Sequence, residues 1–205
     1  MKTQMRFQKI LMLVTLIVAA LSFVYALSFC SGTVYQYSTL YLQSSGKERV
    51  PGAADLFLVS QYDNGILINL SIVFIVVTVL HYIAASQKRR KYYVTNYVAT
   101  GIVVVYQLVF AILLIVYVSE VFSLFNAIDR VAAEAAYLRD DFKYSTINFI
   151  MGYVLVGVVV LNMVALVLNL VWKIKLMQGE KKLLQGAKLV ASVEGALESQ
   201  PEEVV

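Results

Sequence analysis

The side chains best suited to acid–base or nucleophilic chemistry are scarce in this sequence. It has one histidine, His81, and one cysteine, Cys30. That inventory excludes a bis-histidine haem, a cysteine zinc site and an intramolecular disulfide. Asp140 and Asp141 are the only adjacent acidic pair before the C-terminal tail, and two carboxylates do not specify a metal site. No H-E-x-x-H, G-x-S-x-G or glycine-rich phosphate motif is present. We therefore expect no enzyme activity, no catalytic or metal-binding residues and no cofactor.

Composition points instead to a membrane protein. The chain is 60% apolar and only 15% charged, against roughly 25% charged in soluble domains. A transmembrane helix needs about 20 apolar residues. Four runs are long enough and are predicted as spans: residues 7–29, 66–85, 93–118 and 147–172.

The basic residues predict the orientation of these spans. Lys and Arg gather before the first span, in the link 86–92 and at the start of the tail 173–205. The loops 30–65 and 119–146 are acidic by comparison. The positive-inside rule then places both termini and the link 86–92 in the cytoplasm, with the two long loops outside. We divide the chain into one membrane domain, 1–172, and a cytoplasmic tail, 173–205.

The stretch ALSFCSG, at the end of the first run, decides whether that run is a cleaved signal or a span. The run is longer than a signal-peptide core, and no A-x-A cleavage site follows it. Phe29 precedes Cys30, where a lipid-attachment signal requires a small residue. We expect a retained span with a free Cys30. The lone acceptor pattern at Asn69 and the lack of an external disulfide favour a bacterial plasma membrane.

Polar and small residues recur along two of the spans with helical spacing. In the fourth span one stripe of heptad steps contains Asn148, Gly152, Leu155, Val159, Asn162, Leu166 and Asn169. In the first span the residues Thr15, Ala19, Ser22 and Ala26 form a stripe of small side chains. Amides cost free energy in lipid and small residues allow close helix approach, so both stripes are expected to face protein. The alternative is a polar path or ligand groove lined by Asn69, Gln107, Asn162 and Asn169.

The second external loop contains an amphipathic pattern over residues 121–138. It predicts a helix that either continues the third span outward or lies in the membrane interface. The apolar face of this helix includes Phe122, Phe125 and Ile128, which either cover the bundle or dock an outside partner. The tail predicts a further amphipathic helix around Leu183 and Leu184, flanked by lysines.

The link 86–92 contains a cluster of four positive charges, Lys88, Arg89, Arg90 and Lys91, and two tyrosines follow this cluster directly. Basic residues next to aromatic ones can bind nucleic acid. A cluster between two spans is better explained by orientation and by attraction to anionic headgroups. We therefore predict headgroup binding and no nucleic-acid partner.

The spans themselves contain no Asp, Glu, Arg or Pro, which argues against a proton-coupled carrier with broken helices. Lys9 and His81 lie near cytoplasmic span ends, where we expect them to snorkel toward the interface or meet water. The predicted fold is all-α: an up-down bundle of four transmembrane helices with an amphipathic external helix and an amphipathic tail. The predicted function is a non-catalytic integral membrane subunit, an accessory or scaffold component of a larger complex. The alternative is an oligomeric channel or transport component lined by the asparagine stripe of the fourth span. The expected partners are the lipid bilayer and other membrane subunits, or further copies of the chain.

Overall fold

The computed structural model describes residues 2–29, 50–86, 93–129, 131–132 and 146–198. These residues form four long helices and no strand: α1 (Lys2–Phe29), α3 (Ala53–Ser86), α4 (Tyr93–Ala127) and α6 (Ile147–Glu198). Each helix is long and apolar enough to cross a membrane. The prediction of an all-α, multi-pass membrane protein with four spans is confirmed.

The chain forms two compact units, Met1–Leu166 and Val167–Val205. The first unit contains α1, α3, α4 and the first part of α6, and the second contains the rest of α6. The sequence-based boundary lay at Lys173, within the second unit.

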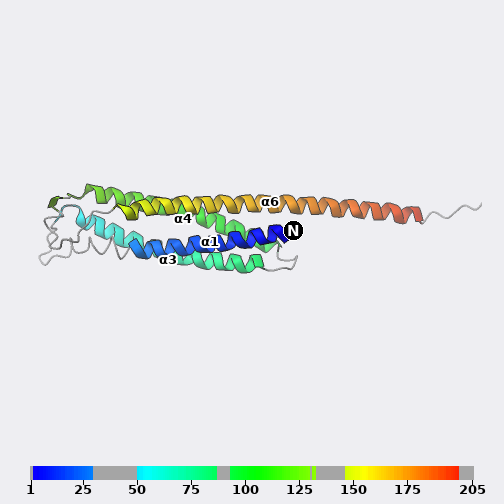
Figure 1. Cartoon of the computed structure of the whole chain (residues 1–205), viewed down its shortest axis with the longest axis horizontal. Helices are drawn as coiled ribbons and strands as arrows, with labels where there is room; N and C mark the ends of the chain where they lie inside the picture. The colour runs from blue at the N-terminus through cyan, green and yellow to red at the C-terminus, as the bar shows by residue number, and fades with distance from the viewer. Residues whose placement is uncertain (1, 30–49, 87–92, 130, 133–145, 199–205) are drawn as a thin grey trace, which may run out of the picture. The chain divides into compact units, whose positions relative to one another are not determined.

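The helices of the first unit alternate in direction, as Figure 1 shows. Side-chain contacts give the same result. Gln8 meets Asn96 and Phe29 meets Tyr117, so α1 and α4 run in parallel. Thr15 meets Asn162 and Phe29 meets Phe149, so α1 and α6 run in opposite directions. α3 packs against both α1 and α4. This packing is consistent with an up-down bundle.

The helix α3 begins well before the predicted span 66–85. Residues 53–65 were expected in an external loop, and the structure shows that they are helical. Gly52 has φ of 85°, a left-handed conformation that glycine adopts without strain. Its carbonyl accepts a hydrogen bond from the Leu56 amide at 3.2 Å, which starts the helix. The buried residues Ala53, Leu56, Ser60 and Asn64 then follow steps of three and four. Residues 53–65 are polar enough to resemble a loop, but they form a helix whose inward-facing residues are buried.

The helix α4 continues beyond the end of the predicted third span, which agrees with one of the two arrangements that the sequence left open. It runs unbroken to Ala127, and residues 133–138 of the predicted amphipathic helix lie outside the described residues. After α4 ends, Asp129 Oδ1 accepts hydrogen bonds from the backbone amides of Val131 and Ala132, at 3.0 and 3.3 Å. An aspartate in this position acts as an N-terminal cap.

An aromatic cluster closes the end of the bundle at which α1 and α4 finish. Phe149 of α6 lies at its centre, with ring centroids 5.0 Å from Phe122, 5.1 Å from Phe125 and 5.7 Å from Phe29. Phe125 and Ile128 are buried and Phe122 is partly buried. The docking-surface prediction for Phe122, Phe125 and Ile128 is therefore wrong, because these side chains belong to the core. Their helical spacing is correct, but they face the bundle.

Candidate functional site

The interior of the first unit holds a set of buried polar side chains, which we call the interior polar set. Its members are spaced by three, four or seven residues along each helix, so each helix turns one polar stripe inward. The outer surface, in contrast, consists largely of exposed Ile, Leu and Val side chains. This inside-out distribution suits a bundle in lipid. The set comprises Gln8, Thr15 and Ser22 of α1, Ser60, Asn64, Ser71, Thr78 and His81 of α3, Asn96, Thr100 and Gln107 of α4, and Asn162 of α6.

The only histidine lies in a polar cluster that joins α3 and α4. His81 is 1% exposed, and its Nε2 lies 2.9 Å from Thr100 Oγ1. The Thr100 hydroxyl donates to the Asn96 carbonyl at 2.8 Å, so it accepts from His81 Nε2–H. The expectation that His81 meets water is therefore wrong. A buried imidazole that donates to a hydroxyl does not act as a base toward that hydroxyl, so this pair is not an activated nucleophile.

The same cluster reaches α1 through a pair of amides. Gln8 Nε2 donates to Asn96 Oδ1 at 3.1 Å, and both side chains are buried. Our sequence analysis missed both residues. The spacing of polar residues could have identified them. Gln8, Thr15 and Ser22 are seven residues apart in α1, and Asn96, Thr100 and Gln107 are four and seven residues apart in α4.

The predicted stripe on α6 faces protein at Asn162. Asn162 Nδ2 donates to Thr15 Oγ1 at 3.1 Å, across α6 and α1. Thr15 Oγ1 also lies 3.3 Å from Asn162 Oδ1 and 2.9 Å from the Leu11 carbonyl. The Thr15 hydroxyl has one proton, which it donates to the Leu11 carbonyl in the shorter contact. The hydrogen bond that joins α1 and α6 is therefore the one that the Asn162 amide donates to the Thr15 oxygen.

Closer to the beginning of α6, the stripe makes a backbone contact and a steric one. The Tyr25 hydroxyl donates to the Asn148 carbonyl at 3.1 Å, while the Asn148 side chain is only partly buried. Gly152 is buried beside Tyr25. A Cβ at Gly152 would collide with the Tyr25 hydroxyl oxygen and would lie 2.7 Å from Val118 Cγ2. Glycine is required there because α1 and α4 side chains occupy the space of any larger residue.

The small-residue stripe of α1 is buried along its whole length. Thr15, Ala19, Ser22 and Ala26 all have no exposed surface. The Ser22 hydroxyl donates to the Val18 carbonyl at 2.9 Å, within its own helix. The stripe therefore packs inside the bundle, and Thr15 is the member that hydrogen-bonds to another helix.

Gln107 differs from the rest of the interior polar set. Its side chain is fully buried, yet neither Nε2 nor Oε1 has a hydrogen-bond partner among the described residues. The contacts Gln8–Asn96 and Phe29–Tyr117 pair α1 and α4 with the same difference in residue number, so the two helices keep one register. That register places Gln107 about one helical turn beyond the level of Thr15. An amide buried without partners costs about 1–3 kcal/mol.

The four residues of the alternative polar groove do not come together. Asn69 is exposed on the outer side of α3, whereas Gln107 and Asn162 are buried. A groove that includes Asn69 is therefore excluded. Asn169 is buried as well, and it belongs to the second unit.

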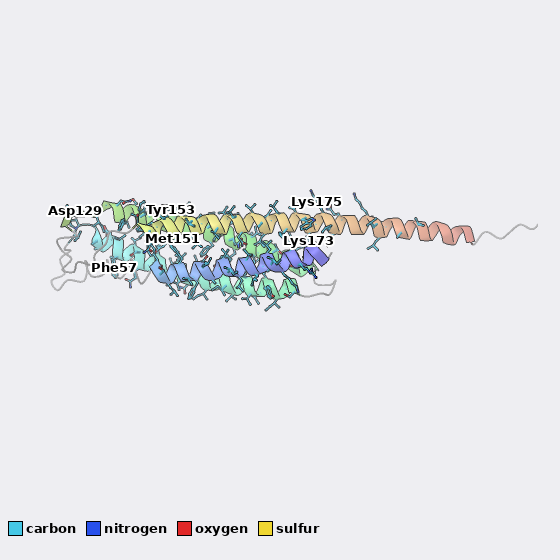
Figure 2. All side chains as sticks on the ribbon, viewed as in Figure 1. Phe57, Asp129, Met151, Tyr153, Lys173 and Lys175 are labelled. Carbon is cyan, nitrogen blue, oxygen red and sulfur yellow. The ribbon has the colours of Figure 1, made fainter. Side chains whose placement is uncertain are left out.

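In the second unit α6 presents an exposed surface over most of its length. Lys173 is buried while Lys175, two residues later, is exposed, and the two project from different sides of the helix (Figure 2). Lys181 and Lys182 are exposed, and Leu183 and Leu184 follow them with 76% and 53% exposure. This segment combines basic and apolar side chains that a headgroup layer or another protein could bind.

A small pocket lies between α3 and α4 at the end of the bundle near the aromatic cluster. Its lining includes Asp63, Leu70, Tyr117 and Glu120. Its two carboxylates are fewer than the six to eight oxygen ligands of a typical calcium site. Within the described part of the chain, no three His, Cys, Asp or Glu side chains are grouped so that they could hold a metal ion.

Several predicted sites lie outside the described residues. These are Cys30, the headgroup-binding cluster Lys88, Arg89, Arg90 and Lys91, and the acidic pair Asp140 and Asp141.

Comparison with known proteins gives no relative from which to infer an activity. No protein-family model, no curated protein and no solved structure matches this chain.

Proposed function

We propose that this chain is a non-catalytic integral membrane subunit that holds or regulates a larger membrane complex. The observation that carries the proposal is that members of the interior polar set hydrogen-bond to one another across helices. Thr15 of α1 bonds with Asn162 of α6, and His81 of α3 bonds with Thr100 of α4. Groups that are buried and bonded in this way stabilise helix association and have no access to a substrate.

The second unit of α6 supplies the surface on which we expect a partner to bind. Leu183, Leu184 and Val190 are exposed apolar side chains in a helix that also carries lysines. Large apolar side chains exposed beside charged ones are typical of interaction surfaces. We place this segment and both termini in the cytoplasm of a bacterium, on the basis of the positive-inside rule.

The test is purification of the full chain from its native host in mild detergent, followed by cross-linking and mass spectrometry. We expect a stoichiometric membrane partner, with cross-links from Lys181 or Lys182. The double variant Leu183→Ser/Leu184→Ser should lose that partner, whereas the exposed control variant Gln178→Ala should keep it. Recovery of the chain with no other protein, across several mild detergents, would contradict the proposal.

An oligomeric channel is the second candidate, and Gln107 favours it. A buried amide without a hydrogen-bond partner is the kind of group that could face a hydrated path in an assembly. Solute or ion flux in proteoliposomes tests this candidate. A channel predicts flux that changes in Asn162→Leu, while the subunit proposal predicts no flux from the purified chain.

The orientation has its own test. Fusion of a reporter that is active only in the cytoplasm to the C-terminus should give activity, and fusion of one that is active only outside should not. The opposite pattern would overturn the assignment of sides and leave the four-helix fold unchanged.

A further inference from the structure

The pocket between α3 and α4 has one acidic end and one apolar end. Asp63 of α3 and Glu120 of α4 line the acidic end, while Leu70 and Leu113 line the apolar end. On each helix the acidic residue and the leucine are seven positions apart, which is about 10 Å along the helix axis. The pocket is therefore a groove whose polarity changes along the length of the bundle.

The acidic end lies at the predicted boundary of the membrane. Asp63 comes three residues before the predicted span 66–85, and Glu120 comes two residues after the predicted span 93–118. The carboxylates are thus at the depth of the lipid headgroups, and the apolar end lies toward the lipid tails. A ligand that fits this groove needs a polar head and an apolar tail in the same order.

The two carboxylates at the acidic end repel each other. Asp63 is half-buried, and the negative charge of Glu120 acts unfavourably on the ionised Asp63 side chain. The structure shows no ion pair between either carboxylate and a basic side chain among the described residues. A cation placed between two carboxylates relieves their repulsion and favours the charged form of both.

The rest of the groove is apolar and large enough for a small molecule. Leu67 and Tyr117 are its buried lining residues, at 2% and 5% exposure, and Ile66 and Leu113 are partly open at 43% each. The cavity volume is about 150 Å³, and a cavity of that size accepts a benzene-sized group. A concave apolar site with a few convergent charged groups is the usual form of a small-molecule site.

We propose that this groove binds an amphiphilic organic ammonium ion, with its cationic group between Asp63 and Glu120 and its apolar tail beside Leu70 and Leu113. An ammonium group has three N–H donors, so it can donate to both carboxylates at once. Such charge-assisted hydrogen bonds are stronger than those between neutral groups. A neutral amphiphile of the same length makes the apolar contacts but lacks the charge that the acidic end selects.

The inference is independent of the proposed function, because it concerns a groove of the first unit and not the exposed surface of the second unit. A chain that has no protein partner can still bind the ammonium ion. A chain that recruits a partner through α6 can do so whether or not the groove is occupied.

The experiment measures protection of a thiol introduced into the groove. The full chain with Ile66→Cys in a Cys30→Ser background is reconstituted in phosphatidylcholine nanodiscs and treated with N-ethylmaleimide, which is uncharged. Octylamine is cationic at neutral pH and should slow the alkylation, whereas octanol, a neutral probe of the same length, should not. Half-maximal protection should need about tenfold more octylamine when Asp63→Asn is added, because one charge-assisted hydrogen bond is lost.

The matched control is Asp55→Asn, which removes an exposed carboxylate of the same helix outside the groove and should leave the protection unchanged. Helical content and thermal unfolding are measured in parallel and should be the same in all variants. Equal protection by octylamine and octanol would overturn the inference, since the groove would then select only apolar chains. It would also be overturned by an absence of protection at every soluble concentration, or by equal protection with and without Asp63→Asn.

Discussion

Two regions inside the bundle differ in whether their buried polar groups are hydrogen-bonded. Where α1 meets α6, the amide of Asn162 donates to Thr15, the Tyr25 hydroxyl donates to the Asn148 carbonyl, and Gly152 leaves room for Tyr25. About one helical turn away, α4 buries Gln107, and neither atom of its amide hydrogen-bonds to a described residue. The first region shows polar groups stabilising helix contacts. The second shows a group whose burial opposes folding unless something else in the assembly satisfies it.

Among the variants of the first region, a larger residue at Gly152 should cause the largest loss of unfolding free energy. Gly152→Ala places a methyl group against the Tyr25 hydroxyl and Val118, so α6 must shift and the bond to Asn148 is strained. We expect a loss of about 1–3 kcal/mol in the free energy of unfolding, measured by denaturant titration in detergent micelles.

The matched control for that variant is Gly157→Ala, at an exposed position where a Cβ meets nothing within 4 Å. It should be neutral or slightly stabilising, because alanine has the higher helix propensity. Equal losses in the two variants would mean that glycine matters for helix flexibility and not for close contact.

Removing the Asn162 amide is the next largest change. Asn162→Leu deletes the hydrogen bond to Thr15 in a protein whose helices have little hydrophobic drive to associate in lipid. We expect a loss of about 1–2 kcal/mol in unfolding free energy. The exposed asparagine variant Asn126→Leu is the control and should unfold like the wild type.

Gln107→Leu tests the second region, and we expect it to raise the unfolding free energy, whereas the variants of the first region lower it. Leucine has a similar volume and no polar atoms to desolvate, so the variant should be more stable by about 1 kcal/mol. Thermal unfolding of the purified chain measures the change. A clear loss of stability would show that Gln107 is satisfied in the folded protein by water or by another subunit.

The smallest effect is expected at Tyr106, on the α3–α4 contact. Its hydroxyl donates to the Leu70 carbonyl at 2.6 Å, and Tyr106→Phe removes only that bond. We expect a loss of about 0.6 kcal/mol, the average for such bonds between membrane helices. Tyr153→Phe is a control at an exposed tyrosine whose hydroxyl lies 3.2 Å from Ser119 Oγ, and it should lose less (Figure 2).

The sequence was sufficient for the fold class because long apolar runs with at most one charged residue each are typical of membrane-spanning helices. Spacing within the fourth span also identified which of its residues share a face, since Gly152 and Asn162 are both buried. Spacing within one helix does not say which neighbour that face meets. For this reason the partners Thr15–Asn162 and Gln8–Asn96 could not be paired in advance.

The remaining errors have related causes. His81 was judged by its distance from the span end, but it faces Thr100 in the interior. Asn69 and Asn64 are polar residues of the same helix, and only their angle around α3 separates the outward one from the inward one. Residues 53–65 contain Asp55, Gln61 and Asp63 and so resemble a loop, yet their inward positions extend the packed face of α3.

We infer that the interior polar residues bonded across helices, such as Thr15 and Asn162, serve helix association rather than chemistry or conduction. A double-mutant cycle of Thr15→Val and Asn162→Leu, measured by unfolding free energy in one detergent, tests it most directly. We expect the double variant to lose less unfolding free energy than the sum of the single losses, with a coupling of about 0.6–1.7 kcal/mol. Additive losses, with no coupling between the two residues, would contradict it.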